Sequence, residues 1–184
     1  MARDEQVPGI RPRPSLGRRL DIVARHSFPA TSTVLLMLLC GLPWGIADEA
    51  VLLPAVTLAA VYFWSLFRPS ALPPPVVFLI GLLLDLLGYL PIGSGVLTLL
   101  LVHGLARRWR RRLTQQGFVT VWLAFVCVGA AAAALLWALT SLLSLRLMPP
   151  GPALFQATLT GAIYPALSAL LIHAHRTIAN PEHA

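Results

Sequence analysis

The feature that most constrains this chain is a series of six long apolar blocks with almost no charge inside them. Only 11% of its 184 residues are charged, against about 25% in an average soluble domain. A membrane-spanning helix needs about 20 mainly apolar residues, and six such spans use most of a chain of this length. We therefore expect an all-α membrane protein of six transmembrane helices. The apolar blocks cover residues 28–42, 51–67, 76–89, 92–106, 118–145 and 153–173.

The basic residues, all of them arginines, predict how these helices are oriented. If the N-terminus is cytoplasmic, the inner segments are 1–27, 68–75, 107–117 and 174–184. They hold six, one, five and one of the fourteen arginines, and the outer segments hold only Arg146. Arginine gathers on the cytoplasmic side of membrane proteins, so we expect a multi-pass protein with both termini in the cytoplasm. The net charge of +7 could serve nucleic-acid binding or contacts with anionic lipid. Because the arginines lie beside apolar blocks, we expect lipid contacts and no nucleic-acid binding.

Three regions follow from this scheme. Residues 1–27 form a cytoplasmic leader rich in Arg and Pro, residues 28–174 the six-helix transmembrane domain, and residues 175–184 a cytoplasmic tail. The stretch from Ser15 to His26 fits two interpretations. It is either a short amphipathic helix on the inner leaflet or an unstructured basic leader.

Proline and aromatic positions refine the scheme. Only the region of Pro91 separates the third and fourth blocks, which could form one interrupted hairpin or two spans. Pro165 lies within the sixth block and predicts a kink there. The end of the second block is rich in aromatic side chains, which are typical of the membrane–water interface. We therefore expect an interfacial belt made of Tyr62, Phe63, Trp64 and Phe67.

Asp85 is the only acidic residue inside an apolar block. A carboxylate in the middle of a membrane costs about 2.5–3.5 kcal/mol on insertion scales, so Asp85 should face other helices or water. Gly81 precedes it by four residues, on the same helix face, and lets another helix approach closely. Asp85 could contact an ion, proton or substrate, or it could be an internal hydrogen-bond anchor. We favour the anchor because the apolar blocks contain no cation to pair with it.

The sequence contains no constellation that predicts catalysis. The segment Gly93-Ser94-Gly95 resembles the serine loop of an intramembrane protease, but His103 and His173 are expected near the opposite membrane face. Cys40 and Cys127 have no CxxC spacing, and no HExxH or phosphate-binding Gly-rich motif is present. We therefore predict a protein that is not an enzyme, with no catalytic, cofactor-binding or metal-binding residue.

An ordered set of short motifs runs from the second block to the fourth. It consists of Tyr62-Phe63-Trp64, Arg68-Pro69, Gly81-x-x-x-Asp85 and Pro91-Ile92-Gly93. In order and spacing this set resembles the MreD family of rod shape-determining proteins. The small size and six predicted spans fit the same family. The resemblance marks seven residues for a structural or interaction role: Trp64, Arg68, Pro69, Gly81, Asp85, Pro91 and Gly93.

The resemblance implies a non-enzymatic scaffold of the cell-elongation complex in the bacterial inner (plasma) membrane. Such a scaffold links the periplasmic protein MreC, the actin-like MreB, and the peptidoglycan glycosyltransferase and transpeptidase in lateral wall growth. The family fold is similar to the substrate-binding membrane subunits of energy-coupling-factor vitamin transporters. An alternative function is therefore a substrate-binding subunit of a vitamin or metabolite transporter, with a ligand cavity between its helices.

A cluster of arginines follows the fourth block and offers a cytoplasmic docking surface. Its other role would be to set topology and bind lipid alone. The cluster consists of Arg107, Arg108, Arg110, Arg111 and Arg112.

Overall fold

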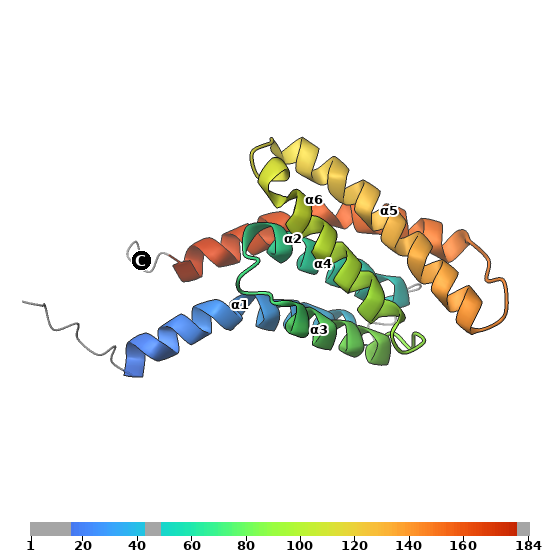
Figure 1. Ribbon diagram of the computed structural model, residues 1–184, viewed down its shortest axis with the longest axis horizontal. Coiled ribbons are helices and arrows are strands. Elements are labelled where there is room, and N and C mark those ends of the chain that lie inside the picture. Colours follow the sequence, from blue (N-terminus) through green and yellow to red (C-terminus); the bar gives the residue numbers. More distant parts are fainter. Residues whose placement is uncertain (1–15, 43–48, 180–184) are drawn as a thin grey trace, which may run out of the picture.

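All regular structure in the described part of the chain is helical (Figure 1). The computed structural model describes residues 16–42 and 49–179, and the side chains of residues 27–42 and 51–174. The predicted all-α class is confirmed, and each predicted block corresponds to one helix. The helices are α1 (Leu16–Cys40), α2 (Glu49–Phe67), α3 (Pro74–Leu87), α4 (Ser94–Leu113), α5 (Phe118–Leu143) and α6 (Gly151–Ala179).

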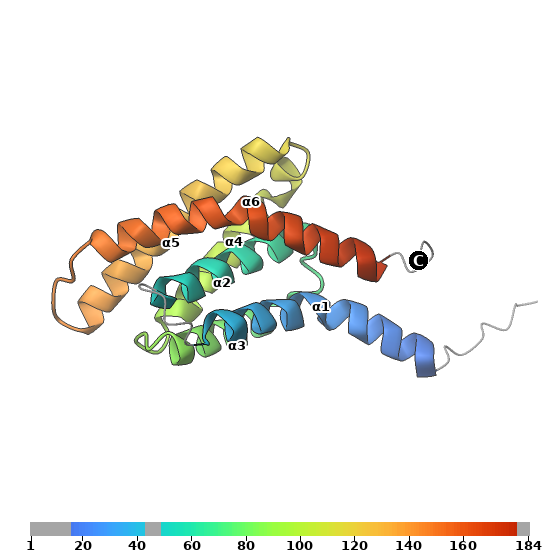
Figure 2. The same ribbon diagram turned by 180° about the vertical axis from the view of Figure 1, so that it is seen from behind.

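Helix α2 is the centre of the bundle. Every residue from Leu53 to Leu66 is buried, because α1, α4, α5 and α6 all pack around this helix. A helix that is apolar on all sides belongs in such a position. Figures 1 and 2 show α2 in the middle of the molecule, between α6 on one side and α1 and α3 on the other.

Successive turns lie at two opposite ends of the bundle (Figures 1 and 2). We call one the arginine end, because it holds Arg107–Arg112, the α2–α3 connection and the α4–α5 turn. The far end holds the α3–α4 turn (residues 88–93) and the α5–α6 connection (residues 144–150).

Two predicted boundaries differ from the structure. Helix α1 begins at Leu16 and continues through Pro29, so residue 27 does not divide a leader from the first helix. The fourth helix extends to Leu113, so Arg107–Arg112 form its last turns and not a loop. Residues 1–15 of the predicted leader, the stretch 43–48 and residues 180–184 of the tail lie outside the described part.

The predicted aromatic belt is wrong for three of its four residues. Tyr62, Phe63 and Trp64 are 1%, 3% and 1% exposed, and only Phe67 is exposed. The reason is that they lie on the central helix, whose neighbours cover even its last turns. Trp64, for example, makes an edge contact with Phe28 of α1, at 5.7 Å between ring centroids.

Helix α6 continues as one helix through Pro165. The third and fourth blocks, for which the sequence left two arrangements open, are two separate helices, α3 and α4.

Two helices are long and apolar enough to cross a membrane: α5, and α6 over Gly151–Ala174. Most of their apolar surface faces outward. Leu123 is 53% exposed on α5, and Leu170 is 54% exposed on α6. Shorter apolar helical segments are Ser27–Cys40, Val51–Phe67 and Pro74–Leu87.

Candidate functional site

The carboxylate of Asp85 on α3 caps the N-terminus of α4. Its Oδ2 accepts the backbone N–H of Gly93 at 2.7 Å, and its Oδ1 accepts that of Gly95, also at 2.7 Å. The hydroxyl of Ser94 lies 3.4 Å from Oδ1 and is closer, at 2.7 Å, to the carbonyl oxygen of Pro91. Asp85 is only 2% exposed. The first N–H groups of a helix lack partners within it and attract negative charge, so this carboxylate satisfies them from the neighbouring helix.

Glycines make this contact sterically possible. Gly93 has φ +98°, a conformation that residues with a β-carbon rarely adopt. A β-carbon at position 95 would lie 2.5 Å from Oδ1 of Asp85, and one at position 81 would lie 2.6 Å from Cα of Val96. The close approach of α3 and α4 therefore depends on Gly81, and the cap depends on Gly93 and Gly95. We call Gly81, Asp85, Gly93 and Gly95 the α3–α4 anchor.

The structure brings together only part of the predicted set of seven residues. Gly81, Asp85, Pro91 and Gly93 meet at the far end of the α3–α4 pair. Trp64 is buried near the end of α2, and Arg68 and Pro69 lie in the α2–α3 connection at the arginine end. The four residues at the far end thus form one unit, whereas the other three lie at the arginine end, on α2 or in the α2–α3 connection.

A second buried link, which the sequence analysis missed, joins α2 to α4. Oγ of Ser65 lies 2.7 Å from Nδ1 of His103, and both residues are buried. Ser65 donates its single O–H to the carbonyl of Val61 at 2.6 Å, so the ring N–H of His103 donates to Ser65. This polarity is opposite to that of a serine nucleophile and its base, which must accept the hydroxyl proton. The two residues are 38 positions apart in the sequence, so no local motif could predict that they pair.

A third link starts from the arginine cluster. Nε of Arg110 donates to the carbonyl oxygen of Leu66 at 2.8 Å, in the last turn of α2. Carbonyl groups at a helix C-terminus lack partners within the helix and favour a nearby cation. All five arginines of the cluster have exposed side chains, so Arg110 is distinguished from the others by this hydrogen bond and not by burial.

We expect Arg110→Ala to lower the free energy of unfolding by about 1 kcal/mol, because it removes this hydrogen bond and leaves the Leu66 carbonyl without its partner. Arg111→Ala is the matched control, since it removes the same charge from an exposed side chain one residue away. The measurement is the unfolding midpoint of each purified variant in mixed micelles. Equal effects of the two substitutions would contradict a specific role for Arg110.

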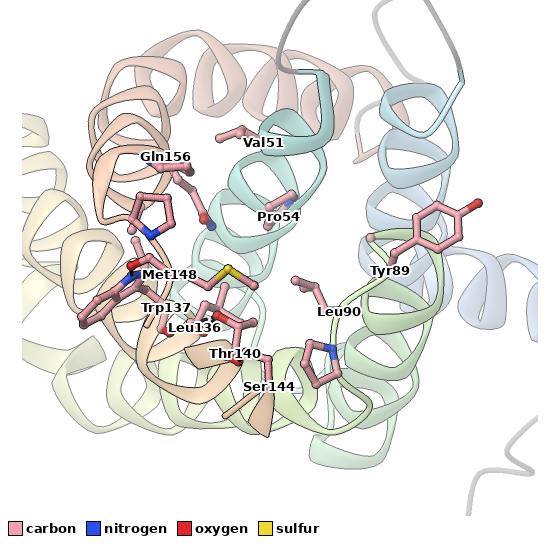
Figure 3. A pocket seen from close by; sticks show the side chains of 16 residues that line it. Val51, Pro54, Tyr89, Leu90, Leu136, Trp137, Thr140, Ser144, Met148 and Gln156 are labelled. Atoms are coloured by element: carbon pink, nitrogen blue, oxygen red, sulfur yellow. Dashed lines mark hydrogen bonds between the residues drawn. The ribbon is translucent and has the colours of Figure 1, made fainter. Parts of the chain in front are cut away.

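A pocket of about 480 Å³ opens at the far end of the bundle (Figure 3). Its walls come from the start of α2, the α3–α4 turn, the end of α5 and the start of α6. Leu90 and Met148 point into it from opposite sides, whereas Tyr89 points away. The volume is typical of small-molecule sites.

No protein-family model, curated protein or solved structure matches this chain. Within the described residues, no group of three or more His, Cys, Asp or Glu side chains could hold a metal ion. The site must therefore be interpreted from its own geometry, which consists of three interhelical hydrogen-bond links and one largely apolar pocket.

Proposed function

We propose that this chain is a six-span inner-membrane scaffold of the MreD type, with a non-enzymatic role in the cell-elongation complex. The observation that carries the proposal is the α3–α4 anchor. Two of the motifs that carry the resemblance, the Gly-x-x-x-Asp helix and the Pro-x-Gly turn, form a single hydrogen-bonded unit. Each oxygen of its carboxylate accepts one backbone N–H, which supports a structural role.

The outward-facing apolar surface supports the six-span arrangement. Large apolar side chains are exposed on every helix from α1 to α6, for example Leu35, Phe67, Leu79, Leu101 and Leu123. A soluble monomer rarely exposes a continuous apolar surface of this extent, whereas lipid would cover it. Turns that alternate between the two ends, with five arginines gathered at one of them, are consistent with cytoplasmic termini.

The two ends of the bundle would meet different partners. In this proposal the arginine end faces the cytoplasm, where an MreB-like actin homologue would bind. The far end faces the periplasm, where an MreC-like scaffold and the extracellular parts of the peptidoglycan glycosyltransferase and transpeptidase would bind. Because the described turns at the far end are short, such partners would contact helix ends and helix faces.

The test is depletion of the protein in a rod-shaped bacterium that makes it. We expect depleted cells to become round, and re-expression of the wild-type chain to restore rods, because lateral wall growth needs an assembled complex. Cell width and length measured by microscopy report the outcome. Reporter tags at the two termini check the orientation separately. Unchanged cell shape would refute the scaffold role, and tags in opposite compartments would refute the six-span arrangement.

The pocket favours a second candidate function, a substrate-binding subunit of a vitamin or metabolite transporter. Its volume of about 480 Å³ would suit a small ligand. Native mass spectrometry of protein purified from its own membrane separates the two functions. A stoichiometric water-soluble compound would favour the transporter subunit, whereas retained phospholipid alone would exclude it.

A further inference from the structure

The pocket is lined mostly by apolar side chains. None of its described lining residues is charged. The hydroxyl groups at the end of α5 are already bonded within the protein: Thr140 donates to the carbonyl of Leu136, and Ser144, just after the helix, donates to that of Thr140. The indole N–H of Trp137 donates to the carbonyl of Met148. Gln156 of α6 is the one amide side chain in the described lining. Beyond this amide, a water-soluble metabolite would find few free hydrogen-bond partners here, and each polar group that it brings must be matched.

The helix lengths place this pocket at a particular depth. Helix α3 has 14 residues and is therefore about 21 Å long, shorter than the hydrocarbon core of about 30 Å. The part of α4 that precedes Arg107 is similarly short. Helix α5, with 26 residues, reaches about 39 Å. If the arginine end lies at the inner surface, the α3–α4 turn ends inside the outer leaflet while α5 crosses it.

The side chains of the α3–α4 turn fit this depth. Tyr89 is 96% exposed and Ile92 is 81% exposed. In the α5–α6 connection, Leu145 and Leu147 are each 89% exposed and flank the exposed Arg146. Turns that meet water normally carry polar side chains, whereas the α3–α4 turn presents two large, mainly apolar ones, Tyr89 and Ile92. In this placement the α3–α4 turn therefore forms one wall of the pocket and ends below the outer membrane surface. The acyl chains of the bilayer lie on its outer side.

We propose that this pocket holds one acyl chain of an outer-leaflet phospholipid, which enters sideways over the α3–α4 turn. The inference rests on the membrane placement in the proposed function, but not on the role in cell shape. The bound chain would fill the space between the α3–α4 turn and the ends of α5 and α6. Its contacts would be the apolar walls, chiefly Leu90, Leu136 and Met148.

Photolabelling tests the proposal. The full-length protein is reconstituted into vesicles of phosphatidylethanolamine and phosphatidylglycerol, with a trace of phosphatidylglycerol that carries a diazirine near the end of one acyl chain. Crosslinked residues are mapped by mass spectrometry. We expect label on Leu136 and Met148 in the pocket, and on Leu123 of α5, which faces the bilayer.

A pocket-filling variant makes the test specific. Ala153 is half-buried and lines the pocket, whereas Ala162 is exposed on the same helix and lines none of the described pockets. We expect Ala153→Phe to lower labelling of Leu136 and Met148 several-fold without changing that of Leu123. Ala162→Phe should change none of the three.

Four outcomes would overturn the proposal. Label on Leu123 with none in the pocket, or pocket label that Ala153→Phe does not reduce, would refute the acyl-chain site and leave the six-span arrangement standing. Absence of label from Leu123 as well would refute the membrane placement and the acyl-chain site together. A water-soluble compound that co-purifies with the protein and is lost in Ala153→Phe would replace the acyl chain by a metabolite.

Discussion

Asp85→Leu is expected to lower the free energy of unfolding by about 2–6 kcal/mol. The substitution removes the acceptors of the Gly93 and Gly95 N–H groups, and leaving a buried donor unsatisfied costs about 1–3 kcal/mol. The leucine also cannot cap α4, so the α3–α4 turn should loosen. The measurement is the unfolding midpoint in mixed micelles, followed by tryptophan fluorescence.

Asp85→Asn is the matched control, because it keeps the shape of the side chain. Its single amide oxygen can accept one of the two backbone bonds, so we expect about half the loss of Asp85→Leu. In the depletion strain, Asp85→Asn should restore rod shape better than Asp85→Leu. Equal and complete loss with both variants would contradict an anchor based on hydrogen bonding and would show that the negative charge itself is required.

Gly81→Ala is expected to destabilise the protein by about 1–3 kcal/mol, the usual range for overpacking. The added methyl group would lie 2.6 Å from Cα of Val96, and a backbone atom cannot move aside as the end of a side chain can. Helices α3 and α4 must therefore separate, which also moves Asp85 away from Gly93 and Gly95. The unfolding midpoint reports the loss of stability, and amide hydrogen exchange at Gly93 and Gly95 reports the weakened cap.

Gly104→Ala is the control for this prediction and should have the opposite sign. Gly104 lies inside α4, and a β-carbon there would meet nothing within 4 Å. Replacing an unconstrained helical glycine by alanine stabilises a helix by about 0.5–1 kcal/mol. If Gly81→Ala were also stabilising, the close contact of α3 with α4 at Val96 would be refuted.

The sequence predicted the helices well because their boundaries have strong local signals. Pro74 opens α3, and the turn that contains Pro91 and Gly93 separates α3 from α4. Spacing also placed Gly81 and Asp85 on one helix face. The start of α1 was harder to predict, because the first apolar block begins at residue 28, whereas the helix begins at Leu16 and continues through Pro29.

The burial of side chains, the interhelical pairs and the pocket all depend on which helix lies at the centre of the bundle. Composition does not reveal which helix that is. The aromatic residues Tyr62, Phe63 and Trp64 would suit an interface on a peripheral helix, but on α2 they form part of the core. The pairing of Ser65 with His103, and of Arg110 with Leu66, joins residues 38 and 44 positions apart. Such pairs arise only from the packing of whole helices, as does the pocket among α2, the α3–α4 turn, α5 and α6.

The enclosed position of α2 has a consequence for biogenesis. This helix is synthesised second, yet α4, α5 and α6, which cover much of it, are made later. Tyr62 can contact the rings of both Phe125 and Tyr164 only after the last helix has left the ribosome. Until then α2 lacks most of its final neighbours. Closure of the bundle is therefore a late, post-synthetic event, and a chain truncated before α6 could not complete it.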